Sequence, residues 1–117
     1  MNTNRIAIFI DGAYFDKTNR DECGLKVDYA KLALKLAGGI DIQLGVDLVL
    51  LSAKQQISHA TVIAGDSDLI PALCVAKNEG VLVHLFHGSA PHRKLVETSD
   101  ERTQITHEFL TGVQYTG

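Results

Sequence analysis

The chain has 117 residues, 45% of them hydrophobic and 21% charged, which excludes a mainly disordered chain and fits one domain with a buried core. The formal net charge of −3 argues against a broad basic surface that binds nucleic acid without selectivity. No apolar run approaches the roughly 20 residues that span a bilayer, and the first residues lack a secretory signal pattern. We therefore expect a cytoplasmic protein with no membrane partner, and we take residues 1–117 as a single domain.

Three short apolar runs predict strands buried on both faces of a parallel sheet. They are RIAIFI at 5–10, ATVIAG at 60–65 and VLVHLFHG at 81–88. The first run ends at an Asp-Gly pair and the second at a Gly-Asp pair, which is typical of the turn that follows a strand. The five histidines show no metal-ligand spacing; we predict that His84 lies in a strand and the other four at the surface.

Helices are predicted between and after these strands. Residues 28–37 begin with a good capping residue and end at a pair of glycines, and residues 41–54 begin with Asp41 as a candidate N-cap. The stretch at 101–110 is also predicted to be helical. Strands that alternate with helices predict an α/β three-layer sandwich with a mainly parallel, Rossmann-like sheet.

A further helix is predicted at 68–78. Either Asp68 or Ser67 is its expected cap, and Pro71 falls in the first turn, where the missing N–H costs little. We predict that Cys74 is a core residue of this helix.

Four acids are candidates for one site. Asp11 and Asp66 each follow a predicted strand, and the carboxyl ends of neighbouring parallel strands meet at the edge where open α/β sheets bind ligands. Asp47 lies within a predicted helix, where Asp is a poor helix former, and Asp68 follows Asp66 by two residues. Turn chemistry explains Asp11 about equally well, and helix capping is the commoner role for an acid placed like Asp68.

A cluster of carboxylates is stable only if some are protonated or a cation lies among them, because the charges repel one another. Mg²⁺ and Mn²⁺ suit oxygen ligands and bind through one or two carboxylates together with waters and substrate phosphates. Such ions assist the attack of water on phosphorus. The four acids therefore predict metal-assisted hydrolysis of phosphodiesters.

The same residues carry a resemblance to the NYN domain family, relatives of the PIN-domain nucleases. It spans about Arg5 to Phe86, with a fainter tail through Asp100, and three stretches carry it: AIFIDGAYFDK, GIDIQLGVDLVLLSA and ATVIAGDSDLIPALCVAKNEGVLVHLF. The resemblance implies a PIN-like α/β fold and a ribonuclease that uses Mg²⁺ or Mn²⁺ and acts on single-stranded or structured RNA.

By the same resemblance, the metal ligands are Asp11, Asp47 and Asp66, and Asp68 completes the catalytic acids as an outer ligand or base. In the second motif the pattern matches both Asp41 and Asp47, of which the latter is the site acid. Asp100 is a loosely aligned candidate for a further acid. The candidate substrate contacts are Tyr14, Lys17, Ser67 and Lys54, with Arg20 as a further basic residue near the acids.

The sequence departs from the family pattern in two ways. Tyr14 stands where many members have Asn, so a polar contact near the metal or the scissile phosphate is expected to be missing or altered. Family members usually have a strand and a long variable segment between the first helical region and the GIDIQLGVD motif. Here KLAGGIDIQLG joins the two almost directly, at Gly38 and Gly39, so the sheet is expected to lack a strand or the sequence to omit a stretch.

These departures keep a second hypothesis open, a catalytically weak module on the same fold that binds RNA or another protein. Self-association into a homo-oligomer also stays open. Other enzyme classes fit the residues less well. The position two residues after Asp11 is Ala13, where an aspartyl phosphatase has a second Asp, and Asp68 interrupts the Gly-Asp-Ser-Leu motif of some esterases. The first strand is not followed by the glycine pattern of a dinucleotide site.

Overall fold

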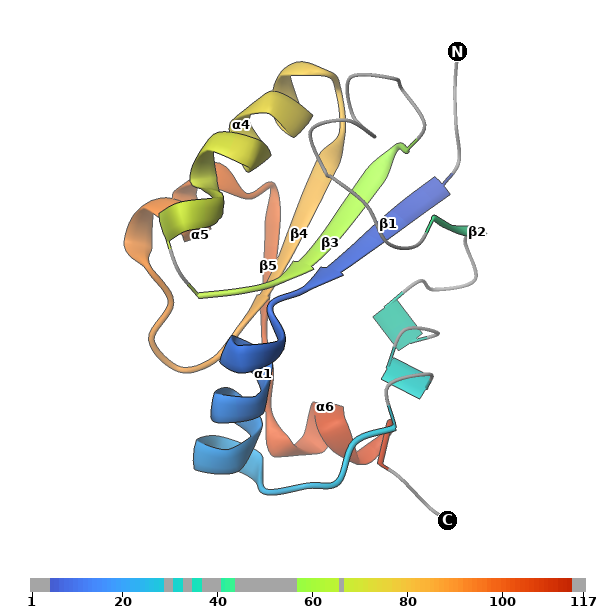
Figure 1. The fold of residues 1–117 in the computed structure, drawn as a ribbon, viewed down its shortest axis with the longest axis vertical. Helices are drawn as coiled ribbons and strands as arrows, with labels where there is room; N and C mark the ends of the chain where they lie inside the picture. Colours follow the sequence, from blue (N-terminus) through green and yellow to red (C-terminus); the bar gives the residue numbers. More distant parts are fainter. Residues whose placement is uncertain are drawn as a thin grey trace.

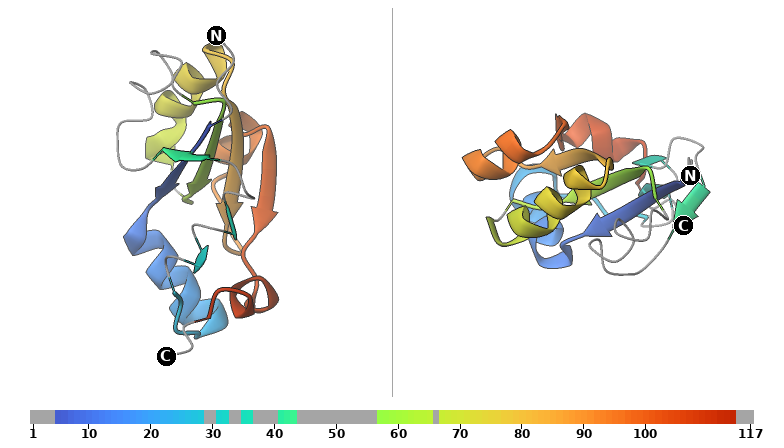
Figure 2. Two further views of the ribbon diagram at one scale, coloured as in Figure 1. Left: turned by 90° about the vertical axis from the view of Figure 1, so that its right-hand side faces the viewer. Right: turned by 90° about the horizontal axis from the view of Figure 1, so that it is seen from above.

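The computed structural model describes residues 5–28, 31–32, 35–36, 41–43, 57–65 and 67–114. They fold into one sheet with helices on both faces, which Figure 2 shows in two further views. None of the described helices is long and apolar enough to cross a membrane.

Five parallel strands form the sheet. They are β1 (Arg5–Ile10), β2 (Asp41–Gln43), β3 (His59–Ile63), β4 (Leu82–His87) and β5 (Glu101–Gln104). Their order is β2-β1-β3-β4-β5, and every neighbouring pair is parallel (Figure 1). The chain passes from β1 to β2 on one side of β1 and then crosses back to β3 on the other side. The strand order therefore reverses between β1 and β3. In open α/β sheets, ligands bind outside the carboxyl ends of the strands at such a switch point.

The helices follow the strands. α1 (Gly12–Thr18) continues β1 and passes into a π-helical turn, η1 (Asn19–Cys23). After β3 comes a 3₁₀ turn, η2 (Ser67–Leu69), and α4 (Ile70–Asn78); α5 (Arg93–Thr98) follows β4, and α6 (His107–Thr111) follows β5. Residues 31–32 and 35–36 are helical as well, and the carboxylate of Asp28 accepts the Lys31 N–H at 3.2 Å, as a capping residue does.

Two hydrophobic clusters cover the two faces of the sheet. Leu73 and Ala76 of α4 and Leu95 of α5 pack on one face against alternate residues of β1, β3 and β4. On the other face, Phe15 of α1 and Leu110 of α6 belong to a second hydrophobic cluster. Its other buried members are Leu32, Leu36, Ile63, Phe86, Ile105 and Val113. The sheet is therefore the middle layer of three, which confirms the predicted α/β sandwich.

The helix predicted at 41–54 is wrong at its start. Asp41 is not an N-cap, because Asp41–Gln43 is strand β2, paired with β1 from Arg5 to Ala7. Apolar and polar residues alternate from Ile40 to Gln43, a strand period that the capping signal outweighed in the sequence. Residues 44–54 and the junction between Gly38 and Gly39 lie outside the described part of the chain.

The helix predicted at 101–110 is also wrong in its first half. Glu101–Gln104 pairs with β4 as strand β5, and the helix begins only at His107. β5 is polar and mostly exposed, so it has no apolar pattern of its own, and pairing with β4 determines its structure. A charged, short edge strand also discourages pairing with other chains.

Smaller differences concern single side chains. Cys74 lies on α4 but is exposed, since the helix buries Leu73 and Ala76 instead. The N-cap of α4 is Leu69, which makes no side-chain capping bond, and not Asp68 or Ser67 as predicted. Pro71 is in the first turn as predicted. His84 is in a strand as expected, whereas His87 is buried at the end of β4 and not at the surface.

Leu85 and Leu82 give a direct test of this core on one strand. Leu85 is fully buried and Leu82 is 53% exposed. Leu85→Ala should lower the free energy of unfolding by about 2–5 kcal/mol, because it removes buried methyl groups and leaves a cavity. Leu82→Ala, the matched control, should change it by no more than about 0.5 kcal/mol. Urea unfolding measures both, and equal losses would contradict the assignment of faces.

Candidate active site

Asp11 lies where β1 ends and α1 begins. Its N–H donates to the carbonyl of Ile63 at 2.9 Å, which adds one rung beyond the β1–β3 ladder. Its Oδ1 accepts the Tyr14 N–H at 3.1 Å, as the N-cap of α1. The side chain is exposed, and no hydrogen bond or ion pair of its second oxygen, Oδ2, is found among the described residues. A helix cap therefore explains one oxygen of this carboxylate and leaves the other available to a ligand.

The carboxyl end of β3 lies beside Asp11. The ladder continues past the strand, where the Ala64 N–H donates to Phe86 at 3.3 Å, and the Gly65 carbonyl accepts the His92 N–H at 3.2 Å. Ser67 is half-buried and Asp68 is exposed, both in the 3₁₀ turn η2 that leads into α4. Three predicted site residues, Asp47, Asp66 and Lys54, lie outside the described part of the chain.

Tyr14 connects α1 to the ends of β3 and β4. Its ring packs on the backbone of Gly65 so closely that a Cβ at Gly65 would overlap Cε1 and Cζ of the ring and lie 2.8 Å from the hydroxyl oxygen. The hydroxyl also accepts the Gly88 N–H at 2.7 Å. The Tyr14 side chain is half-buried and contacts Gly65 and Gly88 of the protein itself. The sequence predicted it only as a substrate contact.

A cleft of about 280 Å³ opens beside Tyr14, one helical turn from Asp11. We call it the Tyr14 cleft. Lys17 lies on its wall and makes no ion pair with another described residue, whereas Arg20, which is not on the wall, is paired with Asp21 at 3.5 Å. The cleft is lined by Tyr14, Lys17, Thr18, Asp21, Glu22, Ser89 and Ala90.

Gly65 and Gly88 are site residues that the sequence interpretation did not single out. A Cβ at Gly88 would lie 2.7 Å from the Glu22 carboxylate and 3.0 Å from the Thr18 methyl group. Neither glycine has a positive φ. At Gly65, close approach of the Tyr14 ring, and not backbone conformation, is what favours glycine. A glycine directly after a buried strand was the available signal.

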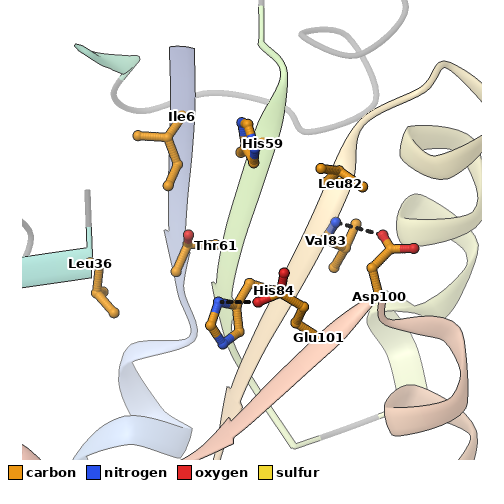
Figure 3. A pocket seen from close by; sticks show the side chains of 9 residues that line it. All are labelled: Ile6, Leu36, His59, Thr61, Leu82, Val83, His84, Asp100 and Glu101. Carbon is orange, nitrogen blue, oxygen red and sulfur yellow. Dashed lines mark hydrogen bonds and ion pairs between the residues drawn. The ribbon is translucent and has the colours of Figure 1, made fainter. Parts of the chain in front are cut away.

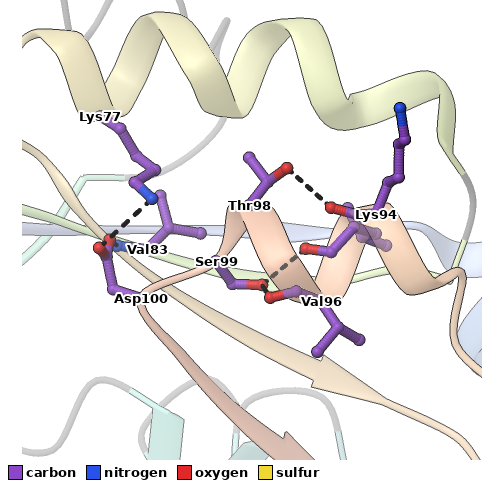
Figure 4. A network of polar contacts seen from close by, with 8 residues as sticks. Lys77, Val83, Lys94, Val96, Thr98, Ser99 and Asp100 are labelled. Atoms are coloured by element: carbon purple, nitrogen blue, oxygen red, sulfur yellow. Dashed lines mark hydrogen bonds and ion pairs between the residues drawn. The ribbon is translucent and has the colours of Figure 1, made fainter.

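Asp100 lies at the other end of the sheet. Its Oδ2 accepts the N–H of Val83, the second residue of β4, at 2.7 Å, and its Oδ1 is 3.7 Å from Lys77 Nζ (Figure 4). Its own N–H donates back to the Val83 carbonyl at 2.9 Å. Because Asp11 follows the carboxyl end of β1, the parallel strands separate the two acids. The structure therefore does not bring Asp100 to the edge that carries Asp11; this acid ties the start of β5 to the start of β4.

A second hollow, of about 140 Å³, lies on the sheet face near the amino ends of the strands (Figure 3). His84 stands at its centre, with Nε2 2.7 Å from the Thr103 hydroxyl and Nδ1 3.7 Å from the Glu101 carboxylate. Burial lowers the pKa of His84, and the nearby Glu101 charge opposes part of that shift. This hollow is at the opposite end from Asp11.

The described residues fit a hard divalent cation in part. No three His, Cys, Asp or Glu side chains among them gather closely enough to hold a metal ion. Asp11 supplies one carboxylate with an available oxygen, and Mg²⁺ binds through only one or two carboxylates together with waters and substrate phosphates. The other two acids that the family resemblance implies as ligands, Asp47 and Asp66, are not among the described residues.

Comparison with known protein families decides the fold family. Residues 28–106, more than half of the chain, match the family model described as NYN domain. The chain belongs to the NYN family. NYN domains are PIN-like and are generally nucleases that act on RNA, in agreement with the parallel α/β fold. The match includes Asp47, Asp66 and Asp68 and begins after Asp11. No curated protein and no solved structure is significantly similar to the chain.

The position of Asp100 in this NYN domain predicts a structural role. Asp100→Ala leaves the N–H of buried Val83 without its side-chain acceptor, so the free energy of unfolding should fall by about 1–2 kcal/mol. Lys77→Ala breaks only the partly exposed ion pair and should cost less than about 1 kcal/mol. Urea unfolding compares the two, and an equally stable Asp100→Ala variant would contradict this role.

His84 predicts how stability depends on pH. Its pKa is lower in the folded chain than the ordinary value of about 6.5, so the unfolded chain binds more protons in that range. The contribution of neutral His84 to the stability of the folded chain is complete above about pH 6.5, and it is lost as the pH falls through the lowered folded pKa. Thermal unfolding between about pH 7 and 5 should show a shallower pH slope for His84→Gln than for wild type. A slope that His84→Gln leaves unchanged would contradict this role of His84.

Proposed function

We propose that this NYN domain is a divalent-metal-dependent ribonuclease whose active site lies at the carboxyl ends of β1 and β3. One observation carries the proposal: Asp11, with an available carboxylate oxygen, is hydrogen-bonded to the end of β3 at the point where the strand order reverses. Open α/β sheets bind their ligands at this place. Asp66 follows Gly65 in the sequence, so the strand order favours its approach to Asp11.

Asp11, Asp47 and Asp66 are the residues that would hold Mg²⁺ or Mn²⁺. When bound, the ion supplies a Lewis acid that activates water and offsets charge on the phosphate. Without a cation, three carboxylates at one edge would repel one another, and they would repel the phosphate of the substrate as well. This electrostatic requirement is why an acidic site with a net negative chain charge can act on a polyanion.

The other predicted residues have roles around this set. We propose that Lys17, on the wall of the Tyr14 cleft and one turn beyond Tyr14, contacts a phosphate of the bound strand. Asp68 accepts a proton or holds a water from the turn η2, and Ser67 and Lys54 are further candidates for contact with the substrate. The substrate is RNA, single-stranded or structured, and residues 1–117 act as a single domain.

A second function has one observation in its favour. The Tyr14 side chain, at the position where many family members have Asn, is engaged on Gly65 and Gly88 and offers no amide to a substrate. A weakly catalytic module that binds RNA or another protein would tolerate this loss. Binding of RNA without cleavage in the presence of Mn²⁺ would distinguish this module from the ribonuclease.

Asp11→Asn tests the ribonuclease. The variant keeps an oxygen for the Tyr14 N–H but removes the charge, so cleavage of a labelled single-stranded RNA in Mn²⁺ should fall at least about 100-fold. Asp16→Asn, an exposed acid on the same helix, should cleave as wild type does. Removal of metal with EDTA should abolish cleavage, and added Mn²⁺ should restore it.

The same experiment distinguishes the two functions. RNA binding should persist in Asp11→Asn, measured by fluorescence anisotropy, since the substitution removes a negative charge from the site. Cleavage that is unchanged in Asp11→Asn, at equal purity and thermal stability, would reject the proposed active site. A hairpin RNA tested in parallel shows which form of RNA the enzyme accepts.

A further inference from the structure

Tyr14 contacts each of three chain segments at this edge of the sheet: the end of β1, the turn after β3 and the end of β4. Its backbone N–H donates to Asp11 Oδ1 at 3.1 Å, its ring packs on Gly65, and its hydroxyl accepts from Gly88 at 2.7 Å. Gly65 precedes Asp66 in the sequence. One residue therefore joins the carboxylate of the first proposed ligand to the backbone next to the second.

The ring of Tyr14 fills the space that a side chain at position 65 would occupy. A Cβ at Gly65 would overlap the phenol ring, so either the ring, whose hydroxyl accepts the Gly88 N–H, or the turn after β3 would have to shift. Conversely, a smaller residue at position 14 would leave the space over Gly65 unfilled. The ring thus fixes how closely α1 approaches the turn after β3.

We propose that Tyr14 is a positioning residue, which sets the separation between Asp11 and the segment that carries Asp66 and so determines the affinity for the divalent cation. The inference rests on the proposed function for its metal. It replaces the expected role of Tyr14 as a substrate contact. Groups that orient metal ligands without touching the metal commonly change metal affinity about 10- to 100-fold when they are mutated.

The ring and the hydroxyl have separable roles. Tyr14→Phe keeps the ring on Gly65 and removes only the acceptor for the Gly88 N–H. It should lower the melting temperature by a few degrees and leave the Mn²⁺ affinity within about 3-fold of wild type. Tyr14→Asn removes the ring and should weaken Mn²⁺ binding about 10- to 100-fold. Titration calorimetry measures Mn²⁺ affinity in the absence of RNA.

A double-mutant cycle with Gly65→Ala tests the size match. In the wild-type background the added methyl group overlaps the ring, so Gly65→Ala should lower the melting temperature by about 5–15 °C and weaken Mn²⁺ binding as Tyr14→Asn does. In the Tyr14→Asn background the space is open, and Gly65→Ala should add little to either loss. If Tyr14→Asn does not fold, the comparison of Gly65→Ala with Tyr14→Phe decides.

Several outcomes would overturn the inference. Tyr14→Asn that binds Mn²⁺ within about 2-fold of wild type, even with a lowered melting temperature, shows a merely structural role. Effects of Tyr14→Asn and Gly65→Ala that add independently show that the two residues do not act through one contact. A raised KM for RNA at unchanged Mn²⁺ affinity restores Tyr14 to the role of substrate contact.

The inference and the proposed function fail in different ways. If wild type binds Mn²⁺ but cleaves no RNA, the ribonuclease is rejected, while the Mn²⁺ affinities of the variants still decide the role of Tyr14. If wild type cleaves RNA and Tyr14→Asn keeps full Mn²⁺ affinity, the positioning role is rejected and the ribonuclease stands.

Discussion

The hydrogen bond from the Asp11 N–H to the Ile63 carbonyl continues the parallel ladder one residue past the end of β1. It is made by backbone atoms, so it depends on the β1–β3 register and not on the side chain of residue 11. This register brings the first acid to the end of β3 at the reversal of strand order. The cap of α1, the packing of Tyr14 and the Tyr14 cleft all follow from that arrangement.

Much of this arrangement could be predicted from local sequence signals. The runs at 5–10, 60–65 and 81–88 are strands, because an apolar run closed by Gly or Asp leaves few alternatives in a parallel sheet. β5 was missed because it is short and polar and owes its structure to pairing with β4, and β2 because the capping signal at Asp41 outweighed its short alternating pattern. Cys74 was misplaced by one helical position, because an apolar residue type says less than the spacing of Leu73 and Ala76.

The candidate site was predictable in its acids and not in its packing. Strand-end position indicated Asp11, whereas Asp100, assigned by a loose alignment, lies at the other end of the sheet beside the start of β4. The contact of Tyr14 with Gly65 joins residues 51 positions apart in the sequence, and neither residue type predicts the other. Such contacts depend on how α1 leaves the sheet, which only tertiary structure determines. The departure of Tyr14 from the family pattern thus becomes a structural substitution with a defined neighbour.

The central claim is that the divalent cation lies at the carboxyl ends of β1 and β3. An anomalous-difference map from crystals grown with Mn²⁺ tests it most directly. The account predicts a peak within about 2.5 Å of Asp11 Oδ2, with carboxylates of Asp47 and Asp66 around it. A peak at the His84 hollow or at Asp100, with none beside Asp11, would contradict the account.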